Sequence, residues 1–201
     1  MVYPKKAYVE DFVFLVDEHV YEPAEDTYLV ADRLDVSKSD TVLDLGTGCG
    51  LLAIVAAKKA RTVVAVDVNP HAIECAAKNA EGNNVTNIDF RRGDLFSSIK
   101  PNEKFSLIIF NSPYLPSEPD EEKTWIGKAW AGGENGRVVI DRFIMQAADF
   151  LGENGRIWLV QSSLSDVDKT VEMFSEQNLH ATVVAQVKVA FETIVLVEAK
   201  R

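Results

Sequence analysis

Short runs of apolar and β-branched residues alternate with longer amphipathic segments along most of the chain. Such runs are typical of strands buried on both faces, and the amphipathic segments have the period of helices that cover a sheet. This alternation predicts an α/β fold with a mostly parallel sheet and helices on both faces. The predicted strands span Thr41–Leu45, Thr62–Asp67 and residues 88–91, 106–110 and 156–161. The predicted helices span residues 24–35, 50–60, 71–81, 136–151 and 165–177.

The last part of the chain has a different pattern. Residues 181–189 and 193–199 are two extended runs joined by a turn too short to hold a crossover helix, so we predict an antiparallel hairpin at one sheet edge. Residues 115–135 show no period and are predicted to form a loop. Because the chain has 201 residues, 47% of them hydrophobic, we expect a single domain over residues 1–201.

Composition narrows the class of function. The formal net charge is -10, whereas proteins that bind nucleic acid by neutralising phosphates are rich in Lys and Arg, which weighs against DNA or RNA as the main partner. Cys49 and Cys75 have no CxxC spacing and the histidines are scattered, so we expect no metal site. No signal peptide and no apolar run of about 20 residues is present, which leads us to expect a cytoplasmic protein.

A glycine-rich turn follows the first of these strands. Gly46, Gly48 and Gly50 let the backbone turn sharply and approach a ligand, while the N–H groups of the next helix face the cleft. Alone, the turn favours a nucleoside-type ligand, and a purely structural turn is the alternative. A dinucleotide site would have a third glycine at position 51, which is Leu here.

Acidic residues stand at the carboxyl ends of three successive predicted strands, where open α/β sheets bind ligands. Asp67 can accept protons from both ribose hydroxyls, and Asp44 can pair with the ammonium of a methionine moiety or, alternatively, act as a turn carboxylate. Asp94 can accept the exocyclic amine of adenine, while Leu95 packs near the ring or donates its backbone N–H. Together these residues predict an S-adenosylmethionine site.

The fourth strand ends in the sequence Asn-Ser-Pro-Tyr at residues 111–114. An amide or exocyclic amine nitrogen is nearly non-basic, so it needs acceptors rather than a prior deprotonation. The Asn111 side-chain oxygen and the Ser112 carbonyl can accept its two N–H hydrogens and stabilise the charge that develops in methyl transfer. Tyr114 can stack on the planar group and Pro113 stiffens the turn. An ordinary turn that closes a strand is the alternative.

A set of motifs over nearly the whole chain carries a family resemblance. They are VYEPAEDT at 20–27, DLGTGCG at 44–50, DVNP at 67–70, GDL at 93–95, NSPY at 111–114, AWAGGENGR at 129–137 and DRF at 141–143. The chain resembles the HemK-like protein glutamine methyltransferases, in the archaeal and eukaryotic branch that modifies the Gly-Gly-Gln loop of class I release factors. The resemblance implies a seven-stranded sheet with a reversed final strand, S-adenosylmethionine as cofactor and S-adenosylhomocysteine as product.

The resemblance also implies residue roles. The cofactor contacts it implies are Thr27, Asp44, Gly46, Asp67, Asp94, Leu95 and Asn111. It implies that residues 111–114 hold the acceptor glutamine and that the N-terminal segment, within residues 1–36, forms a lid and a helix. The lid motif has a simpler alternative, the acidic cap of that helix. The family usually has Pro at position 112, so we expect the serine to give a looser turn and slower catalysis of the same reaction.

The loop and one edge strand have further expected roles. Residues 125–137 follow the acceptor motif and are placed to contact the substrate, or they form only a packed loop. The family implies a small zinc-binding activator protein that adds a strand beside residues 88–91. The alternative is an edge that charge protects against aggregation.

Two other functions remain open. Adenine in DNA or RNA is a rival acceptor, since the same device suits any planar NH2 group, but the acidic composition and the lack of a target-recognition domain weigh against it. A binding protein without activity is the second rival, with Ser112 as its sign of decay.

Overall fold

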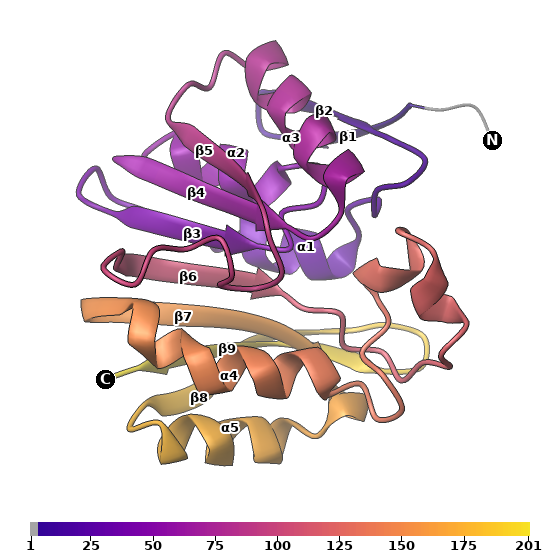
Figure 1. Ribbon diagram of the computed structural model, residues 1–201, viewed down its shortest axis with the longest axis vertical. Helices are drawn as coiled ribbons and strands as arrows, with labels where there is room; N and C mark the ends of the chain where they lie inside the picture. Colours follow the sequence, from indigo (N-terminus) through magenta and orange to yellow (C-terminus); the bar gives the residue numbers. More distant parts are fainter. Residues whose placement is uncertain (1–3) are drawn as a thin grey trace.

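The central feature of the computed structural model, which describes residues 4–201, is a seven-stranded sheet (Figure 1). Its strands are β3 (Thr41–Leu45), β4 (Thr62–Asp67), β5 (Ile88–Arg92), β6 (Phe105–Asn111), β7 (Leu151–Ser162), β8 (His180–Lys188) and β9 (Thr193–Lys200). They lie in the order β5-β4-β3-β6-β7-β9-β8, and β9 runs antiparallel to both of its neighbours. The α/β class, the mostly parallel sheet and the C-terminal hairpin are therefore confirmed.

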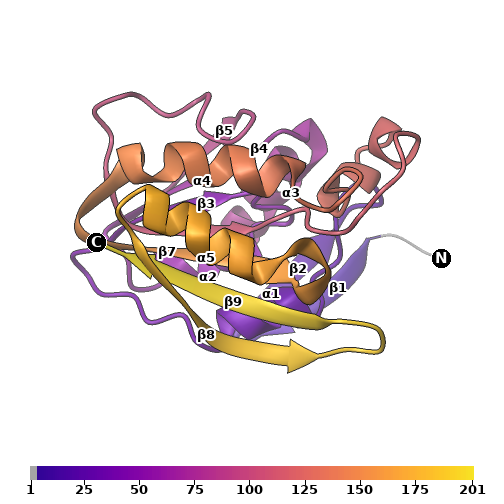
Figure 2. The same ribbon diagram turned by 90° about the horizontal axis from the view of Figure 1, so that it is seen from below.

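Helices cover both faces of the sheet. They are α1 (Glu25–Ala31), α2 (Leu51–Ala57), α3 (Pro70–Gly82), α4 (Val138–Phe150) and α5 (Val167–Glu176). Figure 2 shows α4 and α5 on one face and α1 and α2 on the other, and α3 lies beside the start of α2, where Gly50 meets Ala76. All five predicted helices are present, but α1 ends at Ala31 rather than at residue 35. Within residues 4–201, none of the helices is long and apolar enough to cross a membrane.

Local sequence explains where α3 begins, and three short 3-10 turns lie in the connections between elements. The Asn69 side chain accepts the N–H of His71 and Pro70 opens the helix, as the sequence predicts for the start of α3. The predicted loop contains two short 3-10 turns, η1 (Glu121–Lys123) and η2 (Gly127–Ala129). A third, η3 (Ser163–Ser165), connects β7 to α5.

The N-terminal segment contains a feature that the sequence analysis did not predict. Strands β1 (Lys5–Val9) and β2 (Phe12–Val16) form an antiparallel hairpin separate from the main sheet. The edge of β2 docks on α3, because the Asn79 amide donates to the Leu15 carbonyl at 2.9 Å and accepts the Leu15 N–H at 2.9 Å. Asn83 makes the same pair of bonds with Val13. Two asparagine side chains thus make the hydrogen bonds to backbone N–H and C=O groups of β2 that a neighbouring strand would otherwise make.

This docking generates a first prediction. Asn79 is 3% exposed and also donates to the Cys49 carbonyl at 2.8 Å, so Asn79→Ala leaves several buried backbone groups without partners. We expect the free energy of unfolding in urea to fall by about 2 kcal/mol. The control is the exposed neighbour Lys78→Ala, which should change it by less than about 0.5 kcal/mol. Equal effects of the two substitutions would show that Asn79 does not hold the hairpin.

Candidate active site

A cavity of about 460 Å³ lies at the carboxyl ends of β3, β4 and β6, within the size range of small-molecule sites. Its lining includes residues from both predicted halves of the site. The predicted residues that line it are Thr27, Gly46, Gly48, Asp67, Asp94, Leu95, Asn111, Ser112, Pro113 and Tyr114. The structure therefore brings the predicted cofactor and acceptor residues together around one space, with Asp44 as the exception.

The glycine-rich turn and Asp67 form one wall. One carboxylate oxygen of Asp67 accepts the N–H of Gly48 at 2.9 Å, and the other accepts the N–H of Asn69 at 2.8 Å. Each oxygen retains a further lone pair for a ligand hydroxyl. Gly48 has a φ of 56°, and the nearest atom to a Cβ placed there is the Gly46 carbonyl oxygen at 4.0 Å. The backbone here borders open space, as the close approach of a ligand requires.

Asp44 lies behind this wall and does not line the cavity. It is 1% exposed, and its carboxylate accepts the hydroxyl of Thr47, a residue that does line the cavity, at 2.7 Å. The pKa of Asp44 is raised to about 7, mainly by burial; the Thr47 hydrogen bond opposes the shift, and the nearby charge of Asp67 adds to it. A cation bound nearby would favour the ionised carboxylate.

Asp94 and Leu95 lie at the far end of the cavity. Asp94 is exposed and pairs with the Arg142 guanidinium of α4 at 2.6 Å, a partner that the sequence analysis did not identify. Leu95 adopts a φ of 48°, which is unusual for a branched side chain. Such strained backbone often occurs at functional sites, and it marks the residue whose N–H is predicted to face adenine.

The acceptor half of the cavity is organised by Asp26, a buried carboxylate in the first turn of α1. One of its oxygens accepts the Asn111 side-chain amide at 3.0 Å, and the other accepts the backbone N–H and the hydroxyl of Thr27 at 2.6 and 3.1 Å. Because a carboxylate only accepts hydrogen bonds, the Asn111 amide nitrogen must face Asp26. The Asn111 Oδ1 atom is left buried and without a hydrogen-bond partner among the described residues.

Two phenols surround the same carboxylate. The hydroxyls of Tyr21 and Tyr114 each lie 3.3 Å from Asp26 Oδ2. Burial, followed by the charge of Asp26, raises the pKa of both phenols above the ordinary tyrosine value, so both remain protonated donors. In the sequence, Asp26 is one of several acidic residues at a helix start, and no local pattern predicts that it joins the lid motif to the acceptor motif.

Ser112 makes a hydrogen bond that the sequence does not predict. The residue is 2% exposed, and its hydroxyl donates to the Val160 carbonyl of β7 at 2.7 Å. This bond ties the turn to the sheet. The expectation that the turn is looser than one with proline stays a prediction. The effect of Ser112 on the rate stays a prediction.

The loop after the acceptor turn covers part of the cavity. Trp125, Lys128 and Trp130 line it, and the Lys128 ammonium lies 4.9 Å from the centre of the Trp125 ring. The loop is held by backbone hydrogen bonds between Leu115 and the carbonyl of Trp130 at 3.0 Å, and between Gly132 and the carbonyl of Leu115 at 2.8 Å. In the part of the chain from residue 4 onward, no group of three or more His, Cys, Asp or Glu side chains has an arrangement that could hold a metal ion.

Comparisons with known proteins agree with this geometry. Residues 23–127 match the model of the methyltransferase small domain family. A putative protein N5-glutamine methyltransferase of Methanocaldococcus jannaschii is 38% identical over 195 residues, which cover 96% of this chain and 98% of the relative. Methyltransferase HEMK2 of Homo sapiens is 32% identical over 186 residues, covering 87% of this chain and 86% of the relative.

A solved structure extends the comparison. A chain of the E. cuniculi Mtq2-Trm112 complex, described as responsible for methylation of the eRF1 translation termination factor, superposes with a TM-score of 0.73 at 27% identity. The match covers 91% of this chain and 99% of that chain. The fold and the site thus define a class I methyltransferase. The chain belongs to the methyltransferase small domain family and, within it, to the HemK-like protein N5-glutamine methyltransferases.

The raised pKa of Asp44 predicts a pH-dependent stability of the cofactor-free protein. The unfolded carboxyl has a pKa of about 3.9, against about 7 in the fold, so the folded state binds the proton more tightly. Stability is therefore lost as pH rises from about 4 to 7. We expect Asp44→Asn to remove this loss, so that its melting temperature exceeds that of the unchanged protein at about pH 8 and the difference shrinks toward about pH 5. A difference that does not vary with pH would contradict the assignment.

The hydrogen bond of Ser112 predicts a loss of stability on its removal. Ser112→Ala removes the buried hydrogen bond to the Val160 carbonyl. We expect the free energy of unfolding, measured by urea denaturation, to fall by about 1–2 kcal/mol. Ser175→Ala, on the exposed surface of α5, is the matched control and should have an effect of less than about 0.5 kcal/mol. If the two variants unfold at the same urea concentration as the parent, the hydroxyl does not tether the turn.

Proposed function

We propose that this chain transfers the methyl group of S-adenosylmethionine to the side-chain amide nitrogen of the glutamine in the Gly-Gly-Gln motif of a class I translation release factor. The observation that carries the proposal is the Asn111 Oδ1 atom, which is buried and has no hydrogen-bond partner within residues 4–201. Asn111 lines the same cavity as the predicted cofactor residues. A buried, unpaired acceptor costs free energy unless a ligand donor satisfies it. A planar NH2 group is such a donor.

The residues around the cavity fit the cofactor. When bound, S-adenosylmethionine supplies an electrophilic methyl group on a positively charged sulfur. Asp67 offers free lone pairs for two ribose hydroxyls, and the exposed Asp94 with the N–H of Leu95 suits the edge of adenine. Thr27, Gly46 and Gly48 border the same space. Asp44, buried behind Thr47, would supply a negative charge to an ammonium group from outside the lining. S-adenosylhomocysteine is the product that leaves.

The acceptor residues then orient the amide nitrogen of the substrate for attack on the methyl group. The Asn111 oxygen and the backbone carbonyl of Ser112 accept the two N–H hydrogens, which points the nitrogen lone pair away from them. The new N–C bond would form as the methyl–sulfur bond breaks, and the nitrogen would then release one of its N–H protons to solvent. Before that proton leaves, positive charge develops on the nitrogen. These two acceptors and the negative charge of Asp26 stabilise it. Because Asp26 fixes the Asn111 amide in advance, little reorganisation is needed during the reaction.

The charge around the entrance favours a protein over a nucleic acid acceptor. Glu118, Glu121 and Glu122 are exposed on the loop that borders the cavity, and the net charge is -10. Phosphates approaching this rim would be repelled. Adenine in DNA or RNA remains the alternative acceptor for the same hydrogen-bonding device, without a feature of the structure that favours it.

A protein partner is part of the proposal. We propose that a small zinc-binding activator adds a strand beside β5, which lies at the edge of the sheet with β4 as its one neighbour. The Arg91 ion pairs with Asp89 and Glu103 stand at this edge and are also consistent with protection against aggregation. We further propose that residues 1–201 form one methyltransferase domain, and that it acts in the cytoplasm, where release factors work on ribosomes.

The direct test is methyl transfer from labelled S-adenosylmethionine to a purified class I release factor. We expect label on the intact factor and none when its Gly-Gly-Gln glutamine is replaced. Asn111→Ala should lower kcat by about 100-fold or more, since it removes an acceptor that acts in the transition state. The matched control is Asn102→Ala, an exposed asparagine in another loop, which should leave kcat unchanged.

Two outcomes would overturn the proposal. One is label that persists after the glutamine is replaced, which would mean another acceptor. The other is the absence of label although cofactor binding is shown by calorimetry and the activator protein is present. In that case the assay would be repeated with adenine-containing DNA and RNA.

A further inference from the structure

We propose that Arg137 is a positioning residue for methyl transfer, which holds the acceptor turn at residues 111–115 in place from outside the cavity. Arg137 does not line the cavity, although Val138 and Val139 immediately after it do. The inference rests on the proposed function, because it concerns how the same acceptor turn is held in position.

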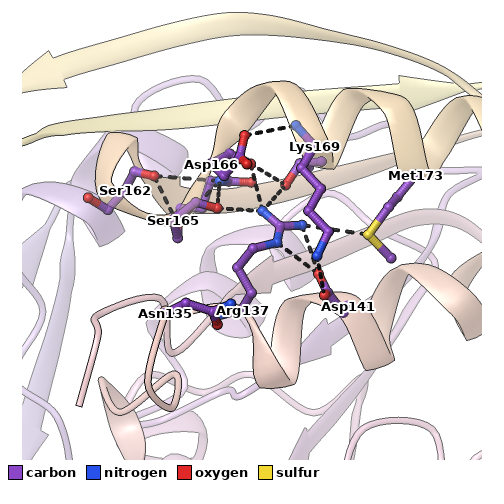
Figure 3. Close-up of polar contacts among 10 residues, drawn as sticks. Asn135, Arg137, Asp141, Ser162, Ser165, Asp166, Lys169 and Met173 are labelled. Atoms are coloured by element: carbon purple, nitrogen blue, oxygen red, sulfur yellow. Dashed lines mark hydrogen bonds and ion pairs between the residues drawn. The ribbon is translucent and has the colours of Figure 1, made fainter.

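The Arg137 side chain makes hydrogen bonds to five residues, most of them drawn in Figure 3, and we call this arrangement the clamp. One terminal nitrogen donates to the carbonyl oxygens of Ser165 and Asp166 and to the Thr170 hydroxyl, the last at 3.0 Å. The Nε atom donates to Asp141 at 2.9 Å, and the other terminal nitrogen lies 3.7 Å from the Met173 sulfur. The residue is 3% exposed. The guanidinium therefore locks the segment before α4 to η3 and the start of α5.

That segment is in direct contact with the acceptor turn. Gly136 has a φ of 72°, and a Cβ placed on it would lie 2.3 Å from the Tyr114 carbonyl oxygen. A Cβ on Gly132 would lie 2.7 Å from the Pro113 carbonyl oxygen. The backbone of residues 132–136 thus packs against the carbonyl groups of the turn with no side chain between them. A shift of Arg137 must move this backbone and, with it, the turn.

The turn is held on its other side by the sheet and by helix α1. Ser112 donates to Val160 of β7, and Asn111 donates to Asp26. The acceptor turn lies between these tethers and the segment that Arg137 anchors. Because interiors are close-packed, loss of one support shifts the turn rather than leaving it in place.

The chemistry of the clamp requires arginine. Its planar group presents five donors in a fixed fork, and here they reach three oxygen atoms of η3 and α5 and a carboxylate of α4 at the same time. A lysine keeps the charge, but one ammonium cannot reach both sets of acceptors. Arg137→Lys therefore loosens the clamp without leaving Asp141 unpaired, since Lys169 also contacts that carboxylate at 3.1 Å.

The competing explanation is that Arg137 only anchors the start of α4. Under that explanation, substitution reduces the fraction of folded enzyme but leaves kcat per cofactor-binding site unchanged. Under our proposal, kcat per site falls while the affinity for S-adenosylmethionine changes little, because Asn111 is the one expected cofactor contact that lies in the turn the clamp supports.

The experiment compares Arg137→Lys and the milder Thr170→Val with Ile144→Val, a fully buried substitution on the same helix. Calorimetry gives the number of sites and the Kd for S-adenosylmethionine, and label transfer to the release factor gives kcat per site. We expect Arg137→Lys to lower kcat about tenfold or more, with Kd within about twofold. Thr170→Val should give a smaller loss of kcat and Ile144→Val none.

Hydrogen exchange supplies a readout that needs no substrate. We expect the amides of Leu115 and Gly132, which bond across the contact, to exchange faster in Arg137→Lys and at the parent rate in Ile144→Val. Unchanged exchange and unchanged kcat per site in Arg137→Lys would overturn the inference. If the unsubstituted enzyme fails to label the glutamine, the proposed function fails instead, and the exchange experiment still decides whether Arg137 holds the turn.

Discussion

The hydrogen bond between Asp26 and Asn111 is the interaction on which the rest of the site depends. It joins the first turn of α1 to the end of β6, across 85 positions of sequence. It also decides the orientation of one amide, because the carboxylate accepts only and the nitrogen must face it. The oxygen that remains is the acceptor on which the proposed chemistry relies. Without this bond the cavity would keep its shape, but the Asn111 amide would no longer be fixed with its oxygen free to accept a hydrogen bond.

The cost of burying the Asp26 charge is met by the surrounding donors. The carboxylate receives hydrogen bonds from the backbone and hydroxyl of Thr27, from the Asn111 amide and from the hydroxyls of Tyr21 and Tyr114. Hydrogen bonds from several donors occupy the lone pairs of this buried carboxylate and offset the loss of its hydration. The lid motif, the acceptor turn and the first helix are therefore coupled through one group.

Parts of this arrangement could be predicted from the sequence because they are local. The glycine-rich turn, Asp67 and the Asn69 cap of α3 follow from patterns that span a few residues, and the sheet order brings them to one edge. The β1–β2 hairpin was missed because its strands have five residues each and are held by Asn79 and Asn83 of a distant helix.

The roles of Asp26 and Ser112 also depend on distant contacts. Acidic residues are common in the first turn of a helix, so nothing local distinguishes Asp26 from a residue that only complements the helix dipole. Ser112 looked like a weaker substitute for proline, yet its hydroxyl meets a carbonyl 48 positions away. Such partners become visible only once the strands are placed beside one another.

The most direct test of the role of Asp26 is the turnover of Asp26→Asn on the release factor, with cofactor affinity measured on the same sample. The substituted amide has the same shape but can also donate, so it no longer fixes Asn111. We expect kcat to fall by roughly tenfold or more while the Kd for S-adenosylmethionine changes by less than about twofold. An unchanged kcat would contradict this role of Asp26.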